Sequence, residues 1–185
     1  FVNDKHVEEC NKPHYTPRFW NGLNKDIKDH TNCYSYAFDH IEIDAEKKLQ
    51  PGELSTGKFS GYYCDEILNK VRSDYNNYDI IEVEKDYIAP CGHYKIALVI
   101  DGKGDEQDYH FYRQDFDGYW SHKPGKNKVR RHDASKNLIK DPETADRNYD
   151  MSDDNQNNET DNNYYEFCGY YSIPYKGGGP FKRIK

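Results

Sequence analysis

Two histidines twelve positions apart, His110 and His122, lie on either side of a predicted β-turn. The aromatic-rich runs 110–115 and 119–122 have the composition of two short strands, and residues 116–118 join them. An imidazole is the side chain best suited to take up and return a proton near neutral pH. A hairpin with both rings on one face therefore supplies a general base and a group that orients it.

The turn chemistry decides whether the two rings share a face. The run 115–118 suits a type I turn, with Asp first and Gly last in the left-handed conformation of a three-residue loop. In that register His122 lies opposite Tyr112 and diagonal to His110, within reach across the strands. A two-residue loop would place the histidines on opposite faces. The predicted face carries His110, Tyr112, Gln114, Trp120 and His122.

The third residue whose side chain could take part in catalysis is Cys33, which follows two candidate capping residues, Thr31 and Asn32. A helix is predicted to run to Ile41, with Cys33, Ala37 and Ile41 on one stripe. A thiol in the first turn of a helix meets free backbone N–H groups and the helix dipole, which stabilise a thiolate. We therefore expect iodoacetamide to label Cys33 quickly at mildly acidic pH.

Together these side chains meet the requirements of nucleophilic catalysis at an amide or ester carbonyl. Cys33 is the predicted nucleophile, His110 the base and His122 the group that orients His110. The backbone N–H of Cys33 is a candidate oxyanion donor. The candidate substrate-binding side chains are the aromatic rings of Trp20, Tyr112 and Trp120. This chemistry needs no cofactor, and none is predicted.

Each candidate also has a structural interpretation. Cys33 is equally consistent with one half of a disulfide, and a histidine on a strand is more often packed than catalytic. A zinc site is the weaker hypothesis because no element carries ligands at paired spacing; its candidates are His93, His110, His122 and His132. A solvated acidic tract is favoured over a calcium loop for Asp150, Asp153, Asp154 and Asp161. No metal is predicted.

The composition describes a polar chain of 185 residues, 35% of them hydrophobic, with a mean hydropathy of −1.19. Its 18 Tyr and 8 Phe can bury large areas and predict a small aromatic core. The net charge of −7, without a basic block, argues against nucleic acid or an anionic membrane as the main partner. No apolar run approaches the length of a membrane span.

Five cysteines in a small chain with one methionine, Met151, fit an oxidising compartment. Their spacings include no CxxC, so we expect two disulfides and one free thiol, with the pairing left open. The disulfide candidates are Cys10, Cys64, Cys91 and Cys168. The sequon at Asn158 is a candidate glycan site in a polar loop. The chain begins at Phe1, and we expect a secreted protein that has lost its signal peptide, or a truncated start.

The elements that must position these residues are helices followed by strands. Helices are predicted from Cys33 to Ile41 and over 62–75, and strands over 79–83, 95–101, the two-histidine hairpin and 164–173. Helices first and an antiparallel sheet afterwards indicate an α+β fold.

The chain is predicted to form one domain with two appendages. Residues 1–30 hold few apolar positions and are expected to be an irregular arm before a single domain over 31–175. Residues 148–163 are a low-complexity polar tract, predicted to be a loop. Residues 176–185 are expected to be a flexible tail.

A cysteine at a helix start, a histidine on a strand and a second histidine across a hairpin resemble the NlpC/P60 branch of papain-like cysteine hydrolases. Phe19-Trp20-Asn21-Gly22 is similar to the aromatic–glycine element that precedes the nucleophile in that family. The resemblance implies N-terminal helices packed on a small antiparallel sheet and an amide- or ester-cleaving Cys-His-His site. By position it makes Cys33 the nucleophile, His110 the base and His122 the orienting group.

Another resemblance rests on longer runs of the sequence itself. The runs NCYSYAF, QPGELSTG, HFYRQDFDGYWSHKPG and DPETADR look like a family of secreted proteins that includes insoluble matrix shell proteins of molluscs. This resemblance implies an extracellular setting. Two hypotheses follow: a secreted cysteine peptidase or amidase acting on a peptide or amide substrate, or a non-catalytic structural or binding component of an extracellular matrix or filament.

Overall fold

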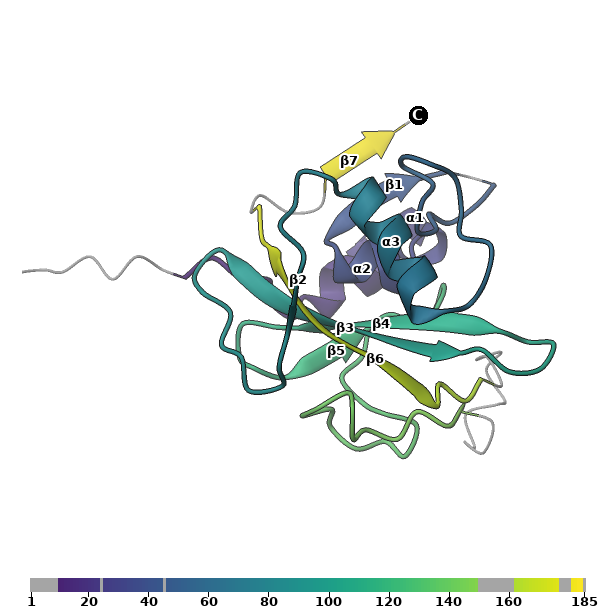
Figure 1. Cartoon of the computed structure of the whole chain (residues 1–185). Coiled ribbons are helices and arrows are strands. Elements are labelled where there is room, and N and C mark those ends of the chain that lie inside the picture. The colour runs from purple at the N-terminus through teal and green to yellow at the C-terminus, as the bar shows by residue number, and fades with distance from the viewer. Residues whose placement is uncertain (1–9, 24, 45, 150–161, 177–180, 185) are drawn as a thin grey trace, which may run out of the picture.

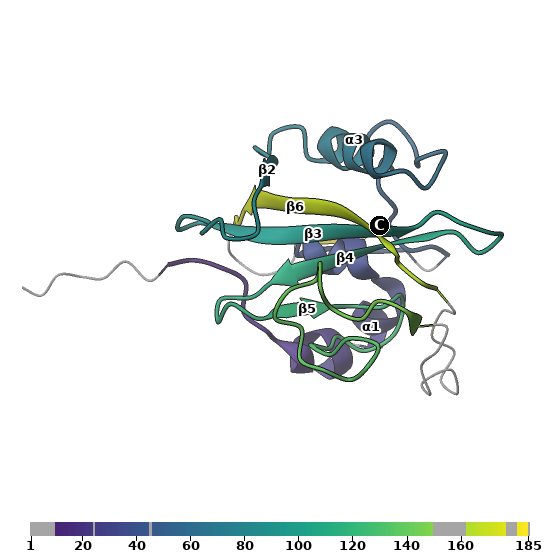
Figure 2. The ribbon, with the colours of Figure 1, turned by 60° about the horizontal axis from the view of Figure 1, so that its bottom comes forward.

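A five-stranded sheet divides the protein into two layers in the computed structural model (Figure 1). The structure describes residues 10–23, 25–44, 46–149, 162–176 and 181–184. Helices α2 (Cys33–Ala37) and α3 (Cys64–Asp74) lie over one face of the sheet, and the loops of residues 124–149 lie on the other. The turned view of Figure 2 shows the strands of the sheet one below another, with α3 above them. The α+β class predicted from the sequence is confirmed.

The sheet is antiparallel throughout, in the order β2-β6-β3-β4-β5. Its strands are β2 (Ile81–Val83), β3 (His93–Asp101), β4 (Asp108–Gln114), β5 (Trp120–His122) and β6 (Glu166–Pro174). A separate parallel pair consists of β1 (His40–Ile43) and β7 (Phe181–Ile184). The strands predicted over 79–83, 95–101 and 164–173, and the helix predicted over 62–75, are confirmed with ends shifted by a few residues.

The central strand β3 shows how the sequence builds two cores. Its Ile96, Leu98 and Ile100 pack with the buried side chains of α2 and α3. The alternate residues Ala97 and Val99 pack on the opposite face, with aromatic rings from β4, β5 and β6. A strand buried on both faces reads as a continuous apolar run, as this one does.

The hairpin β4–β5 has the register predicted from its turn. The Asp115 N–H donates to the Tyr119 carbonyl at 2.9 Å, and the Gly118 N–H donates to the Asp115 carbonyl at 2.9 Å. Gly118 has a φ of 85°, in the left-handed region that favours glycine. Tyr112 pairs with His122 across the strands, so His110 and His122 share a face.

Helix α2 is shorter than predicted. The Asn32 side chain caps it by accepting from the Ser35 N–H at 3.1 Å, so the predicted start is confirmed. The chain then turns at Asp39, whose φ is 49°. The prediction that the helix reaches Ile41 was wrong, because Ile41 belongs to β1 and is buried there. Helical spacing alone did not reveal this break.

Both predicted appendages need correction. Within its described part, the arm predicted to be irregular over residues 1–30 contains two helices, the π-helix η1 (Phe19–Leu23) and helix α1 (Lys25–His30). In the predicted tail, Phe181–Ile184 forms β7 beside β1.

Residues 150–161, which include Asn158 and the acidic calcium candidates, lie outside the described part of the chain. Among the described residues, no helix is both long enough and apolar enough to cross a bilayer.

Candidate functional site: a cysteine and two histidines

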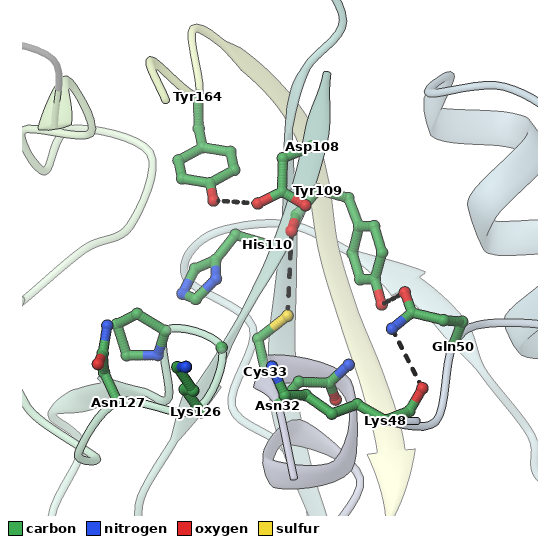
Figure 3. A pocket seen from close by; sticks show the side chains of 12 residues that line it. Asn32, Cys33, Lys48, Gln50, Asp108, Tyr109, His110, Lys126, Asn127 and Tyr164 are labelled. Carbon is green, nitrogen blue, oxygen red and sulfur yellow. Dashed lines mark hydrogen bonds between the residues drawn. The ribbon is translucent and has the colours of Figure 1, made fainter. Parts of the chain in front are cut away.

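Cys33 and His110 line one pocket of about 280 Å³ between the first turn of α2 and strand β4 (Figure 3). His122, on β5, lies behind His110 and completes the predicted group: His110 Nε2 and His122 Nδ1 are 2.8 Å apart. Cys33 is the free cysteine among the described residues. The structure therefore brings together the three residues chosen from the sequence.

The hydrogen bonds assign the tautomers of both rings. His122 Nε2 lies 3.0 Å from the His132 carbonyl oxygen, which can only accept, so this nitrogen carries a proton. A neutral His122 then has a bare Nδ1, which accepts from the Nε2–H of His110. This leaves His110 Nδ1 without a proton, as a general base requires. Arg130 Nε, at 3.4 Å from His122 Nε2, is the longer contact and does not satisfy the His132 carbonyl.

Both imidazoles are neutral in the folded protein. Burial, and then the charge of Arg130, lowers the pKa of His110 to about 3. Burial lowers the pKa of His122 as well, followed by the effects of His110 and Arg130. Each ring would become a buried cation on protonation, next to another cation or another ring.

The Cys33 thiol is protonated, in contrast to the thiolate predicted from its place at a helix start. Burial, and then the nearby Asp108 carboxylate, raises its pKa to about 12. Backbone N–H groups of Phe111 and Tyr34 lower the pKa in part. The thiol lies 4.0 Å from the Tyr109 carbonyl oxygen, a suitable acceptor for S–H. A five-residue helix has too small a dipole to outweigh the loss of solvation.

The rest of the pocket is polar and comes from distant parts of the chain. The Tyr164 hydroxyl donates to Asp108 at 2.6 Å, and the Tyr109 hydroxyl donates to Gln50 Oε1 at 2.8 Å. The lining residues not identified from the sequence are Asn32, Lys48, Gln50, Asp108, Tyr109, Pro124, Gly125, Lys126, Asn127 and Tyr164. Asp108 and Tyr109 directly precede His110, so their position in the sequence could have indicated that they belong to the site. No neighbouring residue or motif indicated this for Lys48 or Tyr164.

A buried lysine holds the loop that forms one wall of this pocket. Lys123 Nζ donates to three carbonyl oxygens, those of Lys28, Thr31 and Gly125, at 2.7, 2.8 and 2.8 Å. Burial, and then the charge of Lys48, lowers its pKa to about 7, whereas three carbonyl acceptors favour the ammonium form. Lys123 thereby joins the chain around α1 to the loop that begins at Pro124.

The three aromatic rings predicted to bind substrate do not line the pocket. Trp20 packs edge-on against Tyr36 in a cluster with α1 and β1. Tyr112 and Trp120 are buried in the cluster beneath the far face of the sheet. Their size and aromatic character make them core residues, since burial of such rings stabilises a fold with few aliphatic side chains.

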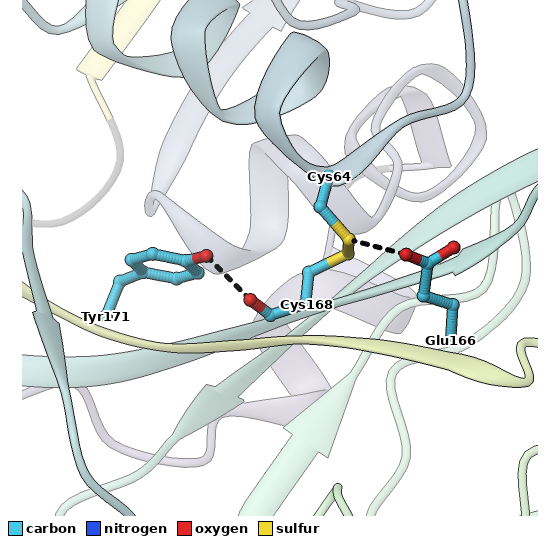
Figure 4. The surroundings of a disulfide bond; sticks show 4 residues. All are labelled: Cys64, Glu166, Cys168 and Tyr171. Atoms are coloured by element: carbon cyan, nitrogen blue, oxygen red, sulfur yellow. Dashed lines mark hydrogen bonds between the residues drawn. A yellow bond between two sulfur atoms is a disulfide. The ribbon is translucent and has the colours of Figure 1, made fainter.

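Two disulfides join the four cysteines predicted to pair, as Cys10–Cys91 and Cys64–Cys168. The second joins the start of α3 to β6 (Figure 4). Beside it, the Tyr171 hydroxyl donates to the Cys168 carbonyl at 2.9 Å, and Glu166 Oε1 lies 3.4 Å from Cys64 Sγ. Cys33 is free, so the pairing alternative for this residue was wrong.

The histidines considered as zinc ligands do not converge. Within the described ranges no three His, Cys, Asp or Glu side chains form a group that could hold a metal ion. His132 contributes its backbone carbonyl to His122, and not its ring. His93 lies at the start of β3, outside the pocket.

Comparison with known proteins adds one relative. The chain is 34% identical over 134 residues to "Insoluble matrix shell protein 1" of Ruditapes philippinarum, which covers 72% of this chain and 80% of the relative. The matched region is therefore most of both proteins. No family model matches the chain, and no solved structure matches it. The NlpC/P60-like fold consequently stays a prediction.

Proposed function

Because the chain belongs to the family of insoluble matrix shell protein 1 of Ruditapes philippinarum, we propose that it is a secreted component of an extracellular matrix. The observation that carries the proposal is the extent of the similarity, which spans most of both chains. Two disulfides support an oxidising, extracellular setting. The partners would be other components of the matrix.

Features of the described surface also suit a binding component. Large apolar or aromatic side chains are exposed at several places instead of being buried, among them Tyr63, Tyr87, Ile88, Phe116 and Tyr165. Tyrosine combines a large contact area with a hydroxyl group, and it is enriched at protein interfaces.

Fractionation of the native tissue tests the proposal. Matrix would be washed with buffer and extracted in sequence with a calcium chelator, a denaturant and a denaturant with reductant, and the protein followed by immunoblot. We expect most of it to resist the buffer wash. Recovery of most of the protein as a soluble monomer in the extracellular fluid would contradict a matrix role.

A second function is supported by the hydrogen-bond chain from the His132 carbonyl through His122 to His110. It leaves a bare nitrogen on His110, in the pocket that Cys33 also lines. We propose that a peptide or similar amide bound there is cleaved through a thioester of Cys33. This activity and the matrix role are compatible in one protein.

The steps follow from the resting state of the site. As Cys33 Sγ attacks the carbonyl carbon, His110 Nδ1 takes the thiol proton, so a stable thiolate is not needed beforehand. His122 Nδ1 accepts from the imidazolium that forms and holds its orientation. His110 then gives the proton to the leaving amine, and a water molecule, deprotonated by the same ring, hydrolyses the thioester. The backbone N–H of Cys33, in the first turn of α2, is the candidate donor to the oxyanion.

Turnover of a fluorogenic peptide-amide library, with mass spectrometry of the intact protein, tests this second function. We expect cleavage that is abolished in both Cys33→Ala and His110→Gln, and an acyl adduct on Cys33 in the wild type. Equal cleavage by Cys33→Ala, or no cleavage and no adduct with any substrate, would contradict it. The fractionation result is independent, so either function can fail alone.

A further inference from the structure

Three residues line both the Cys33 pocket and a second pocket of about 620 Å³ outside it: Lys48, Gln50 and Lys126. We call these residues the neck. Lys48 is half-buried and Lys126 is exposed, and both line the two pockets. Figure 3 shows Lys126 and Lys48 on either side of Cys33. A molecule that fills both pockets would contact the neck, because its residues line both.

The two lysines of the neck carry like charges on the border of the same two pockets. Burial, and then the charge of Lys126, lowers the pKa of Lys48. Lys48 also lowers the pKa of the buried Lys123. Within the described part of the chain, neither neck lysine forms an ion pair. An anion between them would relieve this repulsion.

The carboxylates nearby offset only part of the positive charge at the neck: Asp108 and Asp29 raise the pKa of Lys48, but less than burial and Lys126 lower it. In the outer pocket, Asp29 pairs with Lys28 at 3.0 Å and Glu53 with Lys47 at 3.1 Å, which leaves the exposed Glu46. A further lysine, Lys58, lines the same outer pocket. The neck is thus a local site for anions in a chain whose net charge is −7.

The Cys33 pocket has a carboxylate at the end away from the two neck lysines. This carboxylate belongs to Asp108, which accepts a hydrogen bond from the Tyr164 hydroxyl (Figure 3). A polymer with an anionic group on every unit, such as a sulfated glycan, would bring one of those groups against Asp108. A peptide can place a carboxylate at the neck and a neutral residue near Asp108. Asn127 also lines this pocket, and its side-chain amide suits a peptide group, whereas the amides of Asn32 and Gln50 form hydrogen bonds within the protein.

We propose that the neck binds an aspartate or glutamate side chain, and that the Cys33 pocket takes an acidic segment of a partner protein. The inference rests on the proposed function in taking that partner to be another matrix protein, and it does not require turnover at Cys33. It names a ligand class, an acidic peptide, for a pocket that the comparisons leave unassigned.

Binding of a fluorescein-labelled glycine–serine peptide that carries one aspartate to the purified full chain, followed by fluorescence anisotropy, tests the proposal. The same peptide with asparagine in place of the aspartate is the matched neutral probe. We expect preference for the aspartate peptide, weakened by salt. Lys48→Gln and Lys126→Gln should each weaken binding about two- to fivefold, and the double variant about tenfold. Lys140→Gln, an exposed lysine outside both pockets, carries the same charge change and should not alter binding.

A second readout locates the bound peptide. A saturating concentration of the aspartate peptide should slow alkylation of Cys33 in the wild type, and this protection should be lost in the double neck variant. Equal binding of the two peptides, or equal affinity of the double variant and Lys140→Gln, would overturn the proposal. Tighter binding of chondroitin sulfate than of the peptide, lost in the same double variant, would overturn its assignment to a peptide. None of these results depends on the fractionation of the native tissue.

Discussion

The chemistry of Cys33 is set by its surroundings more than by its position at a helix start. A thiolate there would lie in a buried site next to the Asp108 carboxylate, and both effects favour the neutral thiol. Any reactivity must then come from proton transfer to His110 during the attack. This distinguishes the site from a preformed thiolate–imidazolium pair.

Alkylation kinetics should show this difference directly. With a pKa of about 12, the thiolate fraction of Cys33 rises about tenfold per pH unit. We expect the iodoacetamide rate at Cys33, measured by peptide mass spectrometry, to rise steadily from pH 7 to pH 10 without a plateau. Fast labelling with a plateau at mildly acidic pH would restore the thiolate predicted from the sequence.

Asp108→Asn supplies a matched control for the cause of the shift. Asparagine keeps an oxygen that accepts from the Tyr164 hydroxyl but removes the charge that raises the pKa of Cys33. The rate of alkylation at a given pH should therefore increase in this variant. An unchanged rate would show that burial alone accounts for the raised pKa.

His110 links protonation to folding. Its pKa is about 3 in the folded protein and about 6.5 when exposed, so the unfolded state binds more protons between these values. Stability should fall as the pH falls through this window, by about 3 kcal/mol from this residue between pH 6.5 and pH 4. Urea denaturation at several pH values measures this. His110→Gln should lose less stability on acidification than the wild type, and parallel curves would refute the assignment.

Among the structural elements, the short helices depend on side-chain links to the hairpin. Lys123 follows β5 directly and donates to the carbonyl groups of Lys28, in α1, and of Thr31, just before α2. A five-residue helix has little stability of its own, so such tertiary contacts determine its position. The pocket wall and the helix start that carries Cys33 are thus held by one ammonium group.

Lys123→Met tests this link. Methionine fills a similar volume but leaves three carbonyl oxygens without their donor, so we expect a loss of about 3 kcal/mol in the free energy of unfolding. Urea denaturation followed by circular dichroism measures it. Lys140→Met, at an exposed position, should change stability by less than about 0.5 kcal/mol. Equal stability of the two variants would exclude a structural role for Lys123.

For the whole molecule, the disulfide Cys64–Cys168 joins the helical layer to the sheet. It spans 104 positions, so its removal frees a long loop in the unfolded chain. Fewer aliphatic side chains than usual fill the core, which makes a covalent link between the layers more important.

We expect the double variant Cys64→Ala/Cys168→Ala to lose about 4 kcal/mol of stability and about 10 °C in Tm, measured by calorimetry. Substituting both residues avoids a new free thiol that could pair with Cys33. Cys33→Ala, which keeps both disulfides, is the control and should lose less. A shift of the double variant no larger than that of Cys33→Ala would show that noncovalent packing alone joins the layers.

The sequence alone determined those features that depend on neighbouring residues. The hairpin register follows from the turn at 115–118, because a glycine that accepts a positive φ fixes the length of the loop. The loop length in turn determines which face of the sheet carries His122. The apolar run of β3 and the helical spacing of α3 are equally local. The division of the cysteines into four paired and one free also followed from their number and the expected compartment.

Only the tertiary structure decided what surrounds each side chain. Each of these features depends on segments that are far apart in the chain. They are the pairing of the cysteines, the burial of Trp20 and Trp120, and the position of Lys48 and Lys126 on one pocket. The thiol of Cys33 is protonated for the same reason. Desolvation and long-range charge depend on which groups pack nearby, and these effects exceed the local field of a single helical turn.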